Sequence, residues 1–156
     1  MPLVRILIDG YSLLHNWPRL CAGKAPHSAA AREALIAKLT HYRDAVGTPL
    51  TIFFDGQGAP SGTPKAKSSR EVEVIYSPAG KTADDLIERV AYRLTPYGPV
   101  LVVTDDFAER DMVMGVGGLI SSCNTFISQV EAELGDQAVE LKNHNRREHA
   151  RFRNRH

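Results

Sequence analysis

The sequence contains little cysteine and no long apolar run. Cys21 and Cys123 have neither CxxC nor histidine-partnered spacing, which argues against a zinc site and predicts two small core residues in a reducing compartment. No apolar stretch approaches the roughly 18 residues that a membrane-spanning helix needs. The N-terminus lacks the charged segment, apolar segment and cleavage site of a secretory signal. Together these absences predict a cytoplasmic protein that does not enter a membrane.

The motifs of several large enzyme classes are also missing. The chain has no GxGxxG, Walker A, GxSxG or HExxH sequence, so no dinucleotide site, phosphate loop, serine hydrolase or zinc protease is indicated. The glycine-rich run at 115–118 follows an expected helix instead of a strand, which is typical of a connector. The histidines show no catalytic-triad pattern, and His15 alone lies near Asp9 in sequence.

The charge of the chain is distributed unevenly. A length of 156 residues with 43% hydrophobic and 24% charged residues is typical of one globular domain. Residues 142–156 hold six Lys or Arg residues and one acid, whereas residues 1–141 hold 13 basic and 17 acidic residues. We therefore predict a domain over 1–141 and a basic C-terminal tail over 142–156. The tail indicates either a polyanion partner or a solvated terminal segment.

Apolar patterning predicts alternating strands and helices. Continuous apolar runs at 4–8, 50–54 and 100–103 predict buried strands, residues 71–76 alternate like an edge strand, and 119–121 fit a short strand. Helical spacing predicts helices over 29–46, 82–95, 106–114 and 123–134, with a turn and short helix interrupted by Pro18 over 11–22. Residues 56–70 read as a mobile basic loop. This order predicts a three-layer α/β/α sandwich with a mainly parallel sheet.

Acidic residues follow the three buried runs. Asp9 ends the first run, Asp55 the second, and Asp105 with Asp106 the third. In a parallel sheet the carboxyl ends of the strands meet at one functional edge. Carboxylates gathered there repel one another unless a cation neutralises them, and hard oxygen ligands suit Mg²⁺ or Mn²⁺. The sequence therefore predicts a divalent-metal site of the kind that cuts phosphodiesters.

Helix geometry separates the adjacent pair Asp84 and Asp85. At 100° per residue, Asp84 lies at the rim of the apolar stripe of its helix, whereas Asp85 points nearly opposite to that stripe. Asp84 is therefore the expected ligand. Asp85 fits a capping arrangement with Thr82, three residues before it.

Roles at the other strand ends stay open at this stage. Both Asp9 and Asp55 precede glycine, so each also fits a turn. One of Asp105 and Asp106 can ligate a metal while the other caps the following helix. The hydroxyl groups that can hydrogen-bond these carboxylates or a metal-bound water belong to Ser12 and Thr104, although both also fit ordinary turns.

Four sequence blocks together resemble the YacP-like NYN-domain proteins, a branch of the PIN-like nucleases. They are ILIDGYSLL at 6–14, FFDG at 53–56, TAD at 82–84 and VVTDD at 102–106 followed by Glu109, and the similarity extends over roughly residues 3–135. The resemblance implies a PIN-like fold and metal-dependent RNA endonuclease activity, with some relatives acting on ribosome-associated mRNA. By motif position it implies acidic site residues at Asp9, Asp84 and Asp106, with Asp55 and Asp105 as adjuncts. Ser12 departs from the asparagine that is usual in the family.

From these observations we expect a metal-dependent endoribonuclease that acts on single-stranded RNA. Asp9, Asp84 and Asp106, with Asp105 beside them, would hold one or two Mg²⁺ or Mn²⁺ ions, supported by hydrogen bonds that involve Ser12, Asp55, Asp85 and Thr104. The expected RNA contacts are Tyr11, Lys65, Lys67, Arg70, Arg146, Arg147 and Arg151. Trp17 could also stack on a base, but burial is the favoured expectation. The alternatives are a non-catalytic RNA- or ribosome-binding module and a phosphatase or nucleotide-binding protein.

Overall fold

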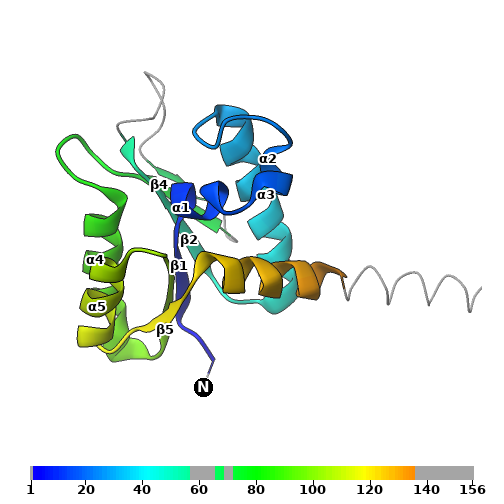
Figure 1. The fold of residues 1–156 in the computed structure, drawn as a ribbon. Helices are drawn as coiled ribbons and strands as arrows, with labels where there is room; N and C mark the ends of the chain where they lie inside the picture. The colour runs from blue at the N-terminus through cyan, green and yellow to red at the C-terminus, as the bar shows by residue number, and fades with distance from the viewer. Residues whose placement is uncertain (1, 57–65, 69–71, 136–156) are drawn as a thin grey trace, which may run out of the picture.

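A central six-stranded sheet organises the chain, with strand order β3-β4-β2-β1-β5-β6 (Figure 1). The computed structural model describes residues 2–56, 66–68 and 72–135. Five strands run parallel, and β3 pairs antiparallel with β4. The strands are β1 (Arg5–Asp9), β2 (Leu50–Phe54), β3 (Ala66–Ser68), β4 (Val72–Tyr76), β5 (Val100–Val103) and β6 (Leu119–Ser121).

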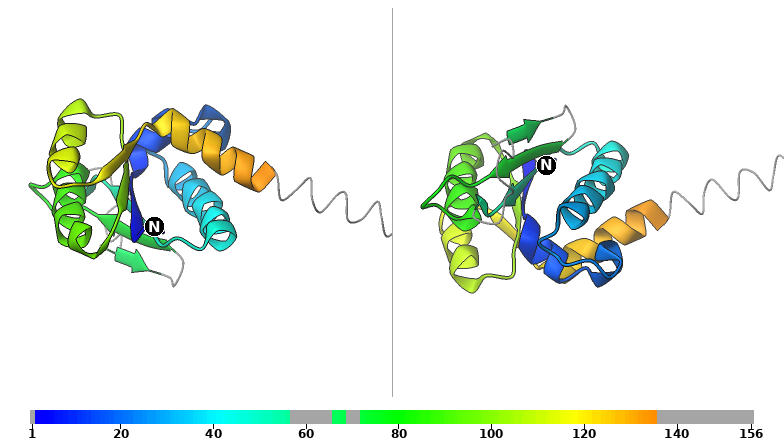
Figure 2. Two further views of the ribbon diagram at one scale, coloured as in Figure 1. Left: turned by 90° about the horizontal axis from the view of Figure 1, so that it is seen from below. Right: turned by 90° about the horizontal axis from the view of Figure 1, so that it is seen from above.

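Helices cover both faces of the sheet (Figure 2). One face carries α1 (Gly10–His15), α2 (Pro18–Cys21), α3 (Ala29–Val46) and a helix over 123–135, and the other carries α4 (Ala83–Leu94) and α5 (Phe107–Gly115). Alternation along β1 separates the two cores, because Ile6 and Ile8 belong to the first while Leu7 belongs to the second. The fold is therefore the predicted three-layer α/β/α sandwich with a mainly parallel sheet.

The predicted helix ends are confirmed where local chemistry sets them. The side chain of Ser28 accepts a hydrogen bond from the backbone N–H of Ala31 at 3.1 Å and begins α3. Gly47, with a φ of 78°, ends the same helix. Thr82 and Asp85 form the predicted capping box at the start of α4. Pro18 is the first residue of α2, where its missing N–H costs nothing.

Two expectations about the second half of the sheet were wrong. The segment 56–70, expected to be a loop throughout, contains β3, whose Lys67 pairs with Val74. The following strand β4 is consequently not an edge strand, because β2 and β3 flank it. The alternation of residues along β4 instead arises because Val72 and Val74 are buried on one face, whereas Glu73 and Ile75 on the other face are half-buried. The predicted boundary at residue 141 and the basic tail lie outside the described residues.

Both Asp-Gly pairs require glycine for space. A Cβ on Gly56 would overlap the backbone carbonyl of Ser77, and one on Gly10 would overlap the ring of Phe54. The backbone N–H of Gly56 also donates to the Ser77 hydroxyl at 2.8 Å, which joins the ends of β2 and β4. These glycines therefore allow close packing directly beside Asp9 and Asp55.

We expect Gly56→Ala to lower the free energy of unfolding by about 2 kcal/mol, because the added methyl group meets backbone that has no space to move. Gly115→Ala is the matched control, since its Cβ would meet nothing within 4 Å, and it should change stability by less than about 1 kcal/mol. Urea unfolding measures both values. Equal stabilities of the two variants would contradict this account of Gly56.

Candidate metal centre

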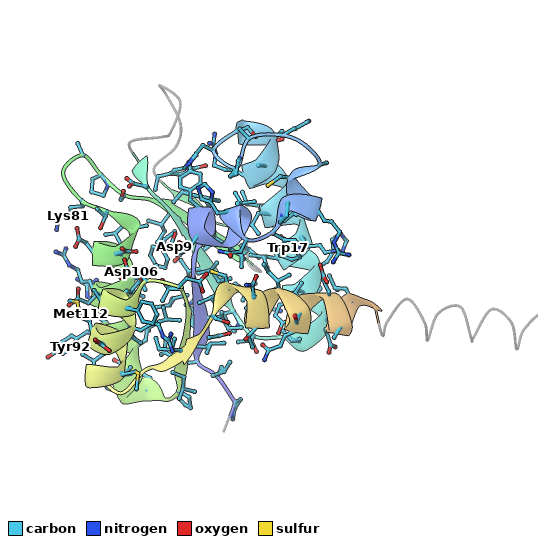
Figure 3. The ribbon with its side chains drawn as sticks, viewed as in Figure 1. Asp9, Trp17, Lys81, Tyr92, Asp106 and Met112 are labelled. Carbon is cyan, nitrogen blue, oxygen red and sulfur yellow. The ribbon has the colours of Figure 1, made fainter. Side chains whose placement is uncertain are left out.

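Three carboxyl groups meet at the carboxyl end of the parallel strands. Asp9 is the last residue of β1, Asp84 lies in the first turn of α4, and Glu109 lies in the first turn of α5. One oxygen from each side chain lies within 4.8 Å of the others. Figure 3 shows Asp9 at the end of β1, between the two helical layers. The predicted convergence of acidic residues is therefore present, with one member different.

Local hydrogen bonds fix the direction of the Asp9 side chain. The Ser12 hydroxyl donates to one Asp9 carboxylate oxygen at 3.0 Å, and the Ser12 backbone N–H donates to the other at 3.4 Å. Asp9 is thus the N-cap of α1 and not a turn residue. The shorter serine side chain at this position still reaches the carboxylate, as expected of a supporting hydroxyl.

The helical-face argument that favoured Asp84 over Asp85 agrees with the structure. Ala83, Ile87 and Ala91 are the buried residues of α4, and Asp84 lies half-buried beside them at the rim. Asp85 is exposed and accepts a hydrogen bond from the Thr82 backbone N–H at 3.1 Å. That bond is the main reason why the pKa of Asp85 is lowered. Asp85 therefore stabilises the helix start and lies outside the carboxylate cluster.

Glu109 is the member of the cluster that we did not expect from the sequence. Its side chain is 4% exposed, and one carboxylate oxygen accepts from the Thr104 hydroxyl at 2.9 Å. The other oxygen is buried and accepts no hydrogen bond from any N–H or hydroxyl group of the described residues. Glu109 lies one helical turn before Val113, and these are the two buried residues of α5. That four-residue spacing was the available sequence signal for Glu109.

The structure places the two predicted ligands from the third strand end outside this cluster. Asp106 is exposed and caps α5, with one oxygen accepting from the backbone N–H groups of Ala108 and Glu109 at 2.9 and 3.2 Å (Figure 3). Asp105 accepts from the Cys123 backbone N–H at 2.9 Å and from the Asn16 side chain at 3.1 Å. The carboxylate cluster thus contains Glu109 where we expected Asp106, because capping directs Asp106 to its own helix.

Burial and mutual repulsion raise two of the three pKa values. Burial, then the charge of Asp84, raises the pKa of Asp9 from 3.8 to about 6. Burial, then hydrogen bonding and repulsion involving Asp84, raises the pKa of Glu109 from 4.5 to about 9. A divalent cation would favour the ionised forms and would satisfy the free oxygen of Glu109. The donor set therefore fits a hard cation with oxygen ligands, such as Mg²⁺ or Mn²⁺.

A pocket of about 460 Å³ opens over two of these carboxylates. Its volume lies in the range of small-ligand sites. The residues that line it are Asp9, Tyr11, Ser12, His15, His27, Asp55, Thr82, Ala83 and Asp84. Asp55 also accepts a hydrogen bond from the Ser77 hydroxyl at 3.4 Å. The buried Glu109 is not among the lining residues.

Tyr11 is not the freely exposed aromatic that base stacking would need. It is 7% exposed, because its ring packs against His27 and Phe54 and its hydroxyl accepts from the buried Arg32 at 3.3 Å. Trp17 is buried, as favoured, and its indole N–H donates to Glu131 at 3.1 Å.

The remaining predicted contacts are described only in part. Lys67 lies in β3, and its proposed RNA contact stays a prediction. The predicted contacts outside the described residues are Lys65, Arg70, Arg146, Arg147 and Arg151.

Both cysteines are buried in the core, and burial raises the pKa of the Cys123 thiol to about 12. No helix in the described ranges is long and apolar enough to span a membrane.

The raised pKa of Glu109 predicts how stability depends on pH without metal. Because the folded state holds this proton more tightly, stability should fall as pH rises between 4.5 and about 9. Between about pH 7 and about pH 8.5, above the range in which Asp9 titrates, wild type should lose about 2 kcal/mol of stability, and we expect Glu109→Gln to abolish this loss. Urea unfolding in EDTA measures the slope. Asp106→Asn, which keeps a helix cap, should show the same slope of stability against pH as wild type. Equal slopes in wild type and Glu109→Gln would contradict the assignment of this pH dependence to Glu109.

Comparison with known proteins agrees with this architecture. The sequence model of the YacP-like NYN domain matches residues 6–155, and so extends into the basic tail that the sequence blocks did not reach. YacP of Bacillus subtilis is 32% identical over 127 residues, which are 81% of this chain and 74% of YacP. The crystal structure of Rae1 (YacP) from B. subtilis has a TM-score of 0.78 at 28% identity, covering 96% of this chain and 85% of that one. A mutant of Rae1 gives a TM-score of 0.76 at 27% identity, with 90% and 82% covered. The chain therefore belongs to the YacP-like NYN domain family, whose domains are nuclease-like.

Proposed function

We propose that this protein is a metal-dependent endoribonuclease that cleaves single-stranded RNA. The observation that carries the proposal is the group of three carboxyl oxygens, from Asp9, Asp84 and Glu109, within 4.8 Å of one another beneath an open pocket. Membership of a nuclease-like family supports the reaction class. The raised pKa values of Asp9 and Glu109 support a cation as the partner that would stabilise their ionised forms.

Each residue has a distinct part in the proposed site. Asp9 and Asp84 reach the pocket and would hold the cation on its open side, while Glu109 would hold it from the buried side through its free oxygen. A bound Mg²⁺ or Mn²⁺ would supply an activated water and stabilise the departing oxygen of the phosphodiester. The hydroxyl groups of Ser12 and Thr104 keep the Asp9 and Glu109 carboxylates in orientation.

A single strand is the proposed form of the substrate, because its backbone can bend into a pocket that lies between two helices. We propose that the RNA is bound to the ribosome in the cytoplasm. This part of the proposal rests on the family resemblance and not on the geometry of the site. The basic residues of 65–70 and of the tail would contact the RNA backbone and make binding sensitive to salt.

Cleavage of labelled single-stranded RNA tests the proposal. We expect cleavage in Mn²⁺ that EDTA abolishes, and a loss of about 100-fold or more in Asp9→Asn and Glu109→Gln, since each removes a charged oxygen ligand. Asp106→Asn should stay within a few-fold of wild type, because Asn also caps helices. Circular dichroism shows whether each variant is folded.

Other results would favour the rival functions. Tight RNA binding without cleavage in either metal would support a non-catalytic binding module. Hydrolysis of a small phosphomonoester in place of RNA would support a phosphatase. Loss of activity in Asp106→Asn with retention in Glu109→Gln would restore the ligand set that the sequence first predicted.

Metal binding can be measured apart from catalysis. We expect Mn²⁺ at 100 times its dissociation constant to stabilise the wild type by about 2.7 kcal/mol. Asp84→Asn should lose most of this gain, because Asp84 interacts with both other acids of the cluster. Calorimetric melting with and without Mn²⁺ gives the shift. An equal gain in wild type and Asp84→Asn would place the cation elsewhere.

A further inference from the structure

The wall of the pocket formed by α1 and the loop before α3 carries two histidines. His15 is the last residue of α1, and His27 precedes the Ser28 cap of α3. Their ring centroids lie 5.1 Å apart, nearly perpendicular at 72°. Both side chains are exposed, and both line the pocket that contains Asp9 and Asp84.

Buried residues hold this wall in place. The ring of His27 packs against Tyr11, with centroids 4.6 Å apart. Arg32, which is 5% exposed, donates to the His27 carbonyl oxygen at 2.7 Å and to the Tyr11 hydroxyl at 3.3 Å. Tyr11 in turn packs against Phe54 at the end of β2. The core thus sets the position of an exposed imidazole ring.

The polar atoms of these rings are available to a ligand. Within the described ranges, no residue forms a hydrogen bond with either imidazole. A buried structural histidine would instead have its nitrogens satisfied. The acidic cluster found among the described residues does not include His15 or His27, so metal ligation does not explain them.

The charge of the pocket limits what these histidines can bind. Asp9, Asp55 and Asp84 line it and would repel the phosphate groups of RNA. Among its described lining residues, His15 and His27 are the two that can carry a positive charge. Imidazole N–H groups donate hydrogen bonds to anionic oxygens, and such charge-assisted bonds are strong.

We propose that His15 and His27 form a phosphodiester-binding subsite, which holds the phosphate beside the scissile one in a single strand of RNA. The identity of the strand rests on the proposed nuclease function. The two sides of the pocket then bind different groups. Asp9 and Asp84 would hold the cation at the reacting phosphate, and His15 and His27 would hold the neighbouring phosphate. Binding at the second phosphate fixes the direction in which the strand enters the pocket.

Paired substitutions at His27 separate its donor groups from its packing. His27→Phe keeps an aromatic ring against Tyr11 and removes the N–H groups, whereas His27→Gln removes the ring and keeps a donor. The readout is the affinity of the full chain for a short fluorescent RNA oligonucleotide in EDTA. His27→Phe should weaken binding about 10-fold and His27→Gln less, and adding His15→Ala to His27→Phe should weaken it further. His41→Gln, an exposed histidine of α3 outside the pocket, is the control and should bind as wild type.

Kinetics in Mn²⁺ provide the second readout. A subsite that binds one phosphate in substrate and transition state alike should raise KM in His27→Phe and leave kcat nearly unchanged. Unchanged oligonucleotide binding in His27→Phe would overturn the proposal. Stronger weakening in His27→Gln than in His27→Phe would also overturn it, since ring stacking would then carry the binding.

The design distinguishes failure of the subsite from failure of the proposed nuclease function. If wild type cleaves no RNA in Mn²⁺ while His27→Phe still weakens oligonucleotide binding, the nuclease proposal fails and the phosphate subsite stands. If wild type shows chelator-sensitive cleavage and His27→Phe binds and cleaves like wild type, the subsite alone fails.

Discussion

Repulsion among three neighbouring carboxyl groups is the constraint on which the site depends. Asp9, Asp84 and Glu109 come from three separate elements, and their packing brings one oxygen of each within 4.8 Å. Without a cation the fold accommodates them by keeping protons, as the pKa of about 9 for Glu109 shows. The remaining structure supplies what this arrangement needs, namely a rigid sheet edge and hydroxyl groups that orient the acids.

The region around the sheet edge is built from short connections between strands and helices. Asp9 ends β1 and also caps α1, so one residue couples the strand to the pocket wall. Asp105 joins the helix over 123–135 to the end of α1 through Cys123 and Asn16. These ties hold the α1 wall of the pocket against the ends of the parallel strands, which explains how its exposed polar side chains keep a defined geometry.

Much of this architecture could be predicted because local patterns carry it. Continuous apolar runs identified β1, β2 and β5, helical spacing identified α3, and the capping arrangement of Thr82 and Asp85 identified the start of α4. The β3 strand was missed because its three residues lie within a polar, glycine- and proline-containing segment that shows no strand period. A pairing partner, β4, defines that strand more than its own sequence does.

By itself, the sequence determined the three-layer architecture and the acidic residues at the strand ends. It also determined that Asp84 lies at the site while Asp85 caps the helix, because periodicity and capping act over three or four residues. Only the tertiary structure decided that Glu109 joins the cluster while Asp106 caps its own helix. It also decided that His27 packs against His15 on one wall of the pocket and that Tyr11 is buried against His27. Burial and convergence arise from packing between distant elements, and no local spacing contains that information.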